Sequence, residues 1–134
     1  MRLWHESLLP LLPRQQLLGQ HRECCALRGN GWGKPHATVN YVFNHPYYYL
    51  YIYHMRVMEQ MLKRGYHPDP VWFDLTYRGQ NHAPAIIDSI HEINQKFADP
   101  SLIYPEHDNT YLIECIKNLA TKGVTLQNLS KIFQ

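Results

Sequence analysis

Two long segments, each opened by a proline and followed by a glycine, constrain the fold of this chain most strongly. They cover residues 13–28 and 46–64, with Gly29 and Gly65 directly after them. Proline is favoured in the first turn of a helix and glycine just past its last turn, so both segments are predicted to be helices. Each is long enough, and apolar enough on one side, to be buried against other parts of the chain.

Further helical patterns follow these two segments, and no strand is predicted. They cover residues 34–44, 84–97, 106–121 and 125–133. A chain of 134 residues is the size of one domain with one hydrophobic core. We therefore expect an all-α fold, a compact single domain over 1–134 in which the amino-terminal segment packs against the first long helix.

Composition argues against several classes of protein. Hydrophobic residues make up 45% of the chain, yet they never run on for the roughly 18 positions that a membrane span needs. The opening residues lack a signal-peptide pattern, so we expect no membrane partner and a cytoplasmic, bacterial nucleoid-associated localisation. The three cysteines, Cys24, Cys25 and Cys115, contain no Cys-x-x-Cys motif, and His45, His54 and His67 show no metal-ligand spacing. Buried thiols, no metal and no cofactor are expected.

Positive charge is concentrated in the first half of the chain. Residues 1–64 contain eight Lys or Arg and three acids, a net charge of +5, whereas residues 65–134 contain five and eight, a net charge of −3. A basic half suits a polyanion such as nucleic acid, although a chain of this size also reaches such an imbalance by chance.

One face of the first predicted helix groups residues that are able to do chemistry. Gln16, Gly19 and Glu23 follow helical spacing, flanked by Gln15 and Arg22. A glycine inside a helix costs about 1 kcal/mol relative to alanine, so Gly19 suggests that the amino-terminal segment or a ligand approaches closely. Simple helix packing explains it equally well. A glutamate beside an arginine is also common as a solvated ion pair, so this pattern alone leaves the role of Glu23 open.

Three short motifs, in order and spacing, resemble the pyrimidine-dimer DNA glycosylase family typified by the phage endonuclease V enzyme. They are Met1-Arg2, the run Gln-Gln-Leu-Leu-Gly-Gln-His-Arg-Glu over 15–23, and Met-Leu-Lys-Arg-Gly-Tyr over 61–66. The likeness is clearest over residues 1–66, with Tyr-Arg-Gly at 77–79 as a further anchor, and it is strongest to a small bacterial branch of the family. It implies a compact helical fold and damaged double-stranded DNA as the partner.

The resemblance also implies a bifunctional activity, in which excision of the base is followed by cleavage at the abasic site. The nucleophile is then the chain's own α-amine, which we assign to Met1 because a bulky Arg2 is expected to block removal of the methionine. The usual pKa of an α-amine, about 7.7–8.0, leaves part of it neutral at physiological pH, and a neighbouring cation lowers that pKa further. Glu23 then stabilises the cationic sugar and the imine and assists β-elimination.

The contacts with substrate follow from the same likeness, with three departures. The histidine that the family carries six residues before Arg22 is Gln16 in this chain. A second arginine that the family carries shortly after Arg22 is absent, and Arg28 is the expected substitute. The aromatic, lysine-containing tail of the phage enzyme has no clear counterpart, so cyclobutane pyrimidine dimers are the first expectation, with other damaged bases or a plain abasic site left open. Trp32, in a glycine-rich loop beside Lys34, is a candidate wedge between bases. The residues expected to contact substrate are Arg2, Gln15, Gln16, Gly19, Arg22, Arg28, Trp32 and Lys34.

A non-catalytic helical DNA-binding module is the alternative function. Such a module would keep the basic face without lesion chemistry, and either protein would bind DNA less tightly as the salt concentration increases. A covalent adduct with abasic-site DNA, trapped by borohydride, separates the two functions. We expect the chain to act as a monomer.

Overall fold

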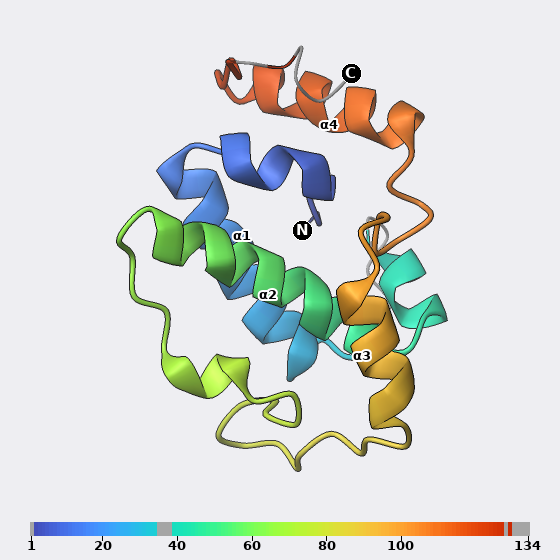
Figure 1. Ribbon diagram of the computed structural model, residues 1–134. Coiled ribbons are helices and arrows are strands. Elements are labelled where there is room, and N and C mark those ends of the chain that lie inside the picture. The colour runs from blue at the N-terminus through green and yellow to red at the C-terminus, as the bar shows by residue number, and fades with distance from the viewer. Residues whose placement is uncertain (1, 35–38, 128, 130–134) are drawn as a thin grey trace.

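Figure 1 shows the computed structural model of the chain, in which residues 2–34, 39–127 and 129 are described. Helices and their connections make up this described part, and no β-strand occurs in it. The predicted all-α fold is therefore confirmed. The helices, with η denoting a 3-10 helix, are η1 (Glu6–Leu11), α1 (Arg14–Arg28), η2 (Asn40–Asn44), α2 (Tyr47–Lys63), η3 (Pro70–Phe73), α3 (Ile90–Ala98) and α4 (Asn109–Thr121).

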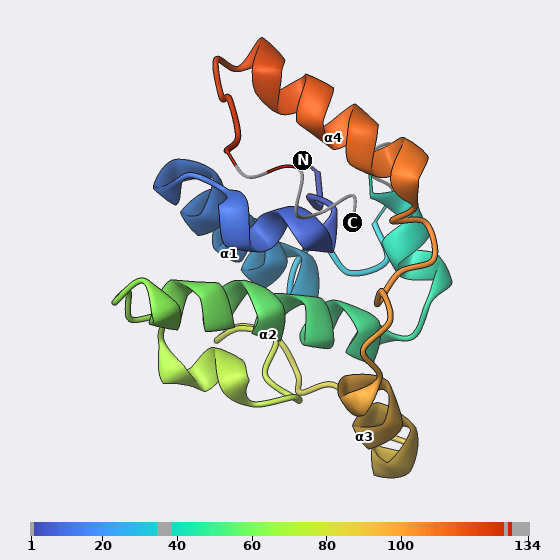
Figure 2. The ribbon, with the colours of Figure 1, turned by 45° about the horizontal axis from the view of Figure 1, so that its top comes forward.

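Helices α1 and α2 pack against each other at the centre of the molecule (Figures 1 and 2). Their observed ends lie within one residue of the predicted ones, and Pro13 and Pro46 occupy the N-cap positions. Burial of their apolar faces, at roughly 25 cal/mol per Å² of apolar surface, is the main source of stability for such a pair. The fully buried apolar side chains of the pair include Leu17, Cys24, Leu27, Leu50, Ile52, Tyr53, Val57 and Met58.

The amino-terminal segment is held by three helices. Leu3 and Trp4 are buried, and the backbone N–H of Trp4 donates to Gln20 Oε1 of α1 at 2.7 Å. Tyr53 of α2 donates its hydroxyl to the Trp4 carbonyl at 2.5 Å, and Tyr111 of α4 donates to the Leu3 carbonyl at 2.5 Å. The predicted packing of this segment against the first long helix is confirmed, and α4 covers it as well.

The predicted helix over 84–97 begins late, as α3 at Ile90, so the prediction was wrong for the residues before it. Ser89 is the N-cap, and its side chain accepts a hydrogen bond from the N–H three residues further on. Upstream, the N–H of Ala85 donates to the carbonyl of Thr76 at 2.8 Å. In a helix that began at residue 84, this N–H would be one of the first four, which have no partner inside the helix. The tertiary bond satisfies it and holds the stretch as a loop.

The remaining predicted helices have mixed outcomes. The helix over 106–121 is confirmed as α4 except at its start, because Asp108 caps it. The segment 34–44 lies partly outside the described residues, and its described part forms only η2. The segment 125–133 lies mostly outside the described residues, and 125–127, which are described, are not helical.

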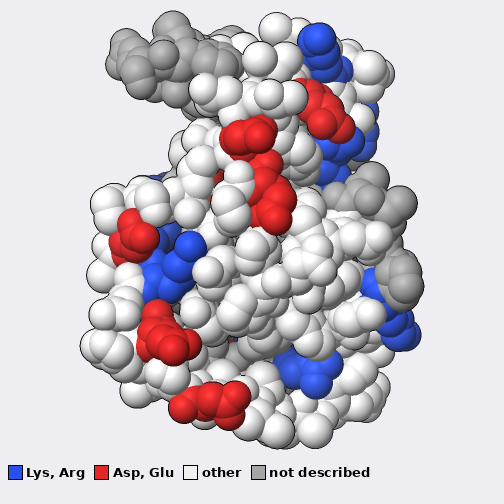
Figure 3. Space-filling view, turned by 90° about the vertical axis from the view of Figure 1, so that its right-hand side faces the viewer, with Lys and Arg blue, Asp and Glu red and all other residues white. Residues whose placement is uncertain are grey.

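The face of the molecule that includes α3 and η2, drawn in Figure 3, carries acidic and basic side chains next to one another. Neither sign forms a continuous band there, so the charge imbalance of the sequence does not produce a basic patch on this face. Among the helices described, none has both the length and the hydropathy needed to cross a bilayer.

Candidate active site

A pocket of about 210 Å³ opens between α1, the amino-terminal segment and the end of α4. Five of the residues predicted to form the site line this pocket, so the fold brings that group together. Larger hollows, each of about 340 Å³, lie beside η1 and beside α3 and contain none of those five residues. The pocket is lined by Trp4, Gln15, Gln16, Gly19, Gln20, Arg22, Glu23 and Lys122.

Among the residues that the structure describes, Glu23 is the only carboxylate that lines this pocket. It is half-buried on α1, and its Oε2 accepts a hydrogen bond from Gln20 Nε2 at 3.1 Å. Burial raises the pKa of the Glu23 carboxyl above its usual range. The positive charge of the amino terminus, the backbone of Arg2, the charge of Lys122 and the Gln20 hydrogen bond all act in the opposite direction. A raised pKa brings a carboxyl group closer to the range in which it exchanges protons at neutral pH.

The backbone of Arg2 lies beside Glu23. Gln20 Nε2 also donates to the Arg2 carbonyl, at 3.0 Å, so one side chain bridges the amino-terminal segment and the acid. The Arg2 guanidinium pairs with the exposed Glu114 at 3.5 Å. A phosphate could replace this partner at low cost, because exposed ion pairs are worth about 1 kcal/mol or less. Met1, the predicted nucleophile, lies outside the described residues.

The outer wall of the pocket comes from the exposed side of α1. Gln15 and Arg22 are exposed, and Gln16 and Gly19 are partly exposed. A methyl group added at Gly19 would meet only Arg22 Nη2, at an ordinary contact distance of 3.8 Å. Solvent, and hence a ligand, can reach all four of these residues, and their contacts with substrate stay a prediction.

Three residues of the pocket were not foreseen as part of the site. Gln20 and Trp4 are nearly inaccessible, at 1% and 6% exposure, and helical spacing from Glu23 had directed attention to Gln16 and Gly19 instead. Lys122 lies about a hundred residues from α1 in the sequence, and its Nζ is 5.6 Å from the centre of the Trp4 ring. Only the fold brings it to the pocket, so no spacing argument could have found it.

Arg28, predicted to contact substrate, is fully buried, and this prediction was wrong. A guanidinium group has five N–H donors, and all five have an acceptor within the protein. Arg28 therefore has no donor left for a phosphate and instead joins the segment 72–77 to α1 and α2. Its acceptors are Tyr47 Oη at 3.0 Å, His54 Nδ1 at 2.9 Å, and the carbonyls of Trp72, Asp74 and Tyr77 at 2.8, 2.9 and 2.8 Å.

Trp32 and Lys34 are not part of the pocket. Trp32 follows the far end of α1, where its ring meets Phe43 and Tyr47 edge-on, with centroids 5.3 and 5.2 Å away. It lines a separate hollow together with Arg78. Lys34 is exposed. Contact of either residue with substrate stays a prediction, and it requires a ligand that extends along α1 beyond the pocket.

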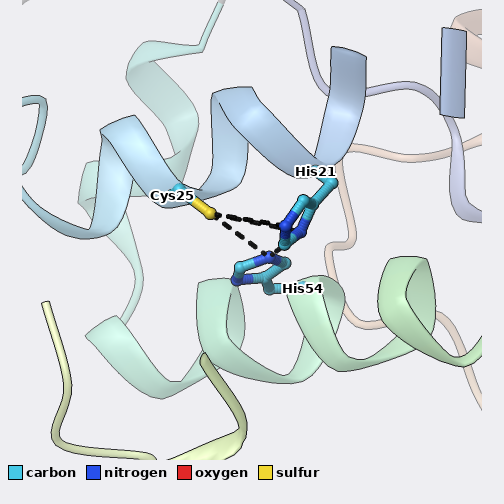
Figure 4. Close-up of side chains that lie close together, drawn as sticks. All are labelled: His21, Cys25 and His54. Atoms are coloured by element: carbon cyan, nitrogen blue, oxygen red, sulfur yellow. Dashed lines mark hydrogen bonds between the residues drawn. The ribbon is translucent and has the colours of Figure 1, made fainter. Parts of the chain in front are cut away.

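A second polar group lies between α1 and α2 and consists of His21, Cys25 and His54 (Figure 4). Their nitrogen and sulfur atoms lie within 4.8 Å of one another, and histidine and cysteine are common ligands of transition metals. His21 Nδ1 and His54 Nε2 are 2.8 Å apart, and Cys25 Sγ is 3.9 Å from His54 Nε2. Spacing along the sequence could not reveal this group, because His54 belongs to another helix.

The hydrogen bonds of this group do not fit a metal site. Arg28 carries only donors, and its Nη1 lies 2.9 Å from His54 Nδ1, so this nitrogen must accept. Burial lowers the pKa of His54 well below its usual range, and the single proton of the neutral ring is then on Nε2, which donates to His21. A metal would need the lone pair of that Nε2 and a Cys25 thiolate, whereas burial raises the pKa of this thiol to about 11. The group is a hydrogen-bond chain from Arg28 to His21.

Comparison with known proteins agrees with the motifs in the sequence. The sequence model of a family described as pyrimidine dimer DNA glycosylase matches residues 1–74, more than half of the 134 residues. The matched stretch contains α1, α2 and every pocket residue except Lys122. Searches of the curated proteins and of the solved structures gave no match. The chain therefore belongs to the pyrimidine dimer DNA glycosylase family, whose members are DNA repair enzymes that act on damaged DNA.

Proposed function

We propose that this glycosylase is bifunctional: it removes a damaged pyrimidine, in the first instance from a cyclobutane dimer, and then cleaves the resulting abasic site. The nucleophile is the α-amine of Met1, and Glu23 assists the cleavage. The amine supplies the electron pair that replaces the bond to the base, so the reaction requires no metal or other cofactor.

The reaction proceeds through an imine. The amine attacks C1′ of the damaged nucleotide, and the bond from C1′ to the base breaks with its electron pair leaving on the base. Opening of the sugar and loss of an amine proton give a protonated imine between the enzyme and C1′. Glu23 stabilises this cation and assists removal of a proton from C2′. The C2′–H electrons form a double bond to C3′, the 3′ phosphate leaves with the C3′–O pair, and water later hydrolyses the imine.

One observation supports this assignment above the others. Glu23 and the backbone of Arg2 share Gln20 as a hydrogen-bond donor, at 3.1 and 3.0 Å. The imine chemistry needs an amine close to an acid. Consecutive Cα atoms are only about 3.8 Å apart, so the position of Arg2 beside Glu23 supports the assignment of the nucleophile to the residue before it.

Cations around the pocket suit the backbone of DNA. Arg22 is exposed at the pocket edge, and the Arg2 guanidinium lies over the rings of Trp4 and Tyr111 and pairs with the exposed Glu114. Guanidinium groups bind phosphate oxygens through two parallel N–H donors, so we assign the phosphates on either side of the lesion to these two arginines. Gln15 and Gln16 then contact the nucleotide itself.

Lys122 is the other amine at the pocket, and it is the competing nucleophile. An α-amine ordinarily titrates two to three pH units below a lysine side chain, so at neutral pH a much larger fraction of the amino terminus is neutral. The amino terminus is therefore the better nucleophile, and Lys122 contributes positive charge next to the phosphates.

Borohydride trapping tests the proposal. The protein is incubated with a duplex that contains one abasic site, and the reductant converts an imine into a stable adduct. We expect an adduct with the wild type and with Lys122→Arg, and none after selective acetylation of the amino terminus. Glu23→Gln is expected to slow strand cleavage by about 100-fold or more while an adduct still forms. If no damaged duplex gives an adduct, the chain is a DNA-binding module without this chemistry.

Mass spectrometry of the trapped adduct locates the nucleophile. Proteolysis should yield the modified peptide that begins at Met1. If the active protein lacks its initiator methionine, the α-amine of Arg2 takes the role. Cleavage of a panel of duplexes, with a cyclobutane dimer, another damaged pyrimidine or a plain abasic site, identifies the preferred lesion.

A further inference from the structure

We propose that Gln20 is a positioning residue that sets the Glu23 carboxylate against the amino-terminal segment, and hence against the reacting amine. The inference rests on the proposed function of the same pocket. Gln20 is 1% exposed, which leaves it no room to act on a substrate directly. Its effect on the reaction must pass through the groups that it holds.

The Gln20 amide uses both of its donor hydrogens and its oxygen. Nε2 donates to the Arg2 carbonyl at 3.0 Å and to Glu23 Oε2 at 3.1 Å. Oε1 accepts from the backbone N–H of Trp4 at 2.7 Å. The single proton of the Tyr53 hydroxyl is shared between Oε1, at 2.9 Å, and the Trp4 carbonyl, at 2.5 Å.

These partners allow only one orientation of the Gln20 amide. The Arg2 carbonyl and an ionised Glu23 only accept hydrogen bonds, and the N–H of Trp4 only donates. An amide rotated by 180° would place its oxygen against two acceptors and its NH₂ group against a donor, and buried groups left without partners cost about 1–3 kcal/mol each. The donor nitrogen is therefore held toward Glu23.

This arrangement has two consequences for catalysis. A bond to Oε2 limits the positions that the flexible Glu23 side chain can take, and a displacement of about 1 Å in a reacting group can cost about 100-fold in rate. A donor also favours the ionised carboxylate, so the Gln20 bond lowers the pKa of Glu23 against the effect of burial. Removing the donor should therefore reduce the rate and make Glu23 easier to protonate.

Other charged groups around Glu23 must stay unchanged for this effect to be measured. They are the amino terminus, Lys122 after α4, and Arg22, which lines the same pocket on α1. Each favours the ionised carboxylate by its positive charge. A substitution at Gln20 by an uncharged residue leaves all three in place.

The test compares Gln20→Met with Tyr53→Phe. Gln20→Met removes both donors with little change in length, and we expect kcat/KM for abasic-site cleavage to fall about 10- to 100-fold. At low pH, kcat/KM falls as Glu23 is protonated, and this acid limb of the pH profile should move to higher pH in the variant, because Glu23 must be ionised to act. Tyr53→Phe removes the single hydroxyl proton that Gln20 Oε1 and the Trp4 carbonyl share, and it leaves the donor side of the Gln20 amide untouched. It should lower stability yet leave the acid limb in place.

Gln20→Glu tests the positioning role of Gln20 if Gln20→Met does not fold. Glutamate keeps oxygen acceptors for Trp4 and Tyr53 and turns an acceptor toward Glu23, so its acid limb should move to higher pH further than that of Gln20→Met. An unchanged rate and acid limb in a folded Gln20 variant would overturn the positioning role. Wild-type protein that forms no borohydride adduct would instead overturn the proposed function.

Discussion

Helix α1 contributes to two polar clusters that differ in how far their hydrogen-bonding capacity is used. The open cluster consists of Arg2, Gln20 and Glu23, and the closed cluster of His21, Arg28 and His54. In the open cluster the carboxylate is half-buried and borders a pocket. In the closed cluster Arg28 and His54 are fully buried, and every donor of the guanidinium has a partner.

The contrast between Arg22 and Arg28 shows what the difference means. Both belong to α1 and both were predicted to contact DNA, but Arg22 is exposed at the pocket while Arg28 is 0% exposed. A buried guanidinium is stable only if its charge and all its donors are compensated, which makes it part of the architecture. An exposed guanidinium keeps its donors for a ligand. The comparison predicts that changes in the two clusters affect different measured quantities.

The largest effect is expected for Arg28→Ala. The substitution leaves His54 and three backbone carbonyls without their donor, and unpaired buried groups cost about 1–3 kcal/mol each. We expect the free energy of unfolding, measured by urea denaturation, to fall by at least about 3 kcal/mol, a large part of the usual 5–15 kcal/mol. Arg22→Ala is the matched control and should stay within about 0.5 kcal/mol of the wild type. Equal stability of the two variants would contradict the distinction between the clusters.

Acid should weaken the protein through its buried histidines. Burial lowers the pKa of His21 and of His54, and it lowers that of His107 to about 3. Each histidine takes up a proton near pH 6.5 in the unfolded chain but only at lower pH in the folded one. The contribution of each histidine to the free energy of unfolding is therefore complete above pH 6.5. It is lost, by up to about 1.4 kcal/mol per pH unit, as the pH falls toward the pKa that the histidine has in the folded protein.

Urea denaturation between pH 7 and 5 measures this slope. Glu23 has a raised pKa and acts with the opposite sign, since the folded state binds its proton first as the pH falls. His107→Gln keeps an acceptor for the Tyr41 hydroxyl, which lies 2.6 Å from His107 Nε2, and removes one titrating group. In His107→Gln the free energy of unfolding should change less steeply with pH than in the wild type. A stability that does not change between pH 7 and 5 would exclude this role of the buried histidines.

The sequence allowed α1 and α2 to be predicted because local and tertiary preferences agree there. A proline, an apolar face and a glycine all favour the same two segments, and burial then stabilises them. The stretch before α3 was mispredicted because Ile86 continued the helical spacing of the isoleucines after it. The Ile86 side chain is 88% exposed, so it gains little from burial. The backbone next to it forms a tertiary hydrogen bond from the N–H of Ala85 to the carbonyl of Thr76. No local pattern carries that information.

The burial of Arg28, which was predicted to contact substrate, has a geometric reason. Arg14, His21 and Arg28 recur every seven residues, which looks like one exposed stripe, but seven residues fall about 20° short of two full turns. Over two such steps the stripe rotates by about 40°, and its members pass from exposed Arg14 through half-buried His21 to buried Arg28. The open cluster was predicted better, because its acid and pocket wall share one face of α1.

A smaller effect, on binding alone, is expected at the open cluster. Arg22→Ala should weaken binding to a damaged duplex and reduce the slope of log K against log salt concentration by about 0.9, the loss of one phosphate contact. The measurement is a salt titration by fluorescence anisotropy. Lys34→Ala, which removes an exposed cation outside the pocket, is the comparison. A larger change in slope for Lys34 than for Arg22 would move the main phosphate contact away from the pocket.

The smallest expected effect concerns Gly19, on the pocket face of α1. Gly19→Ala should raise stability by up to about 1 kcal/mol, because alanine favours a helix and the added methyl meets only Arg22 Nη2 at 3.8 Å. Gly29→Ala should lower stability, because its methyl would lie 2.5 Å from the Arg78 carbonyl. If Gly19 leaves space for the substrate, the more stable Gly19→Ala protein should also cleave abasic-site DNA more slowly. Wild-type kcat/KM in that variant would assign Gly19 to helix packing and leave substrate recognition to the side chains around it.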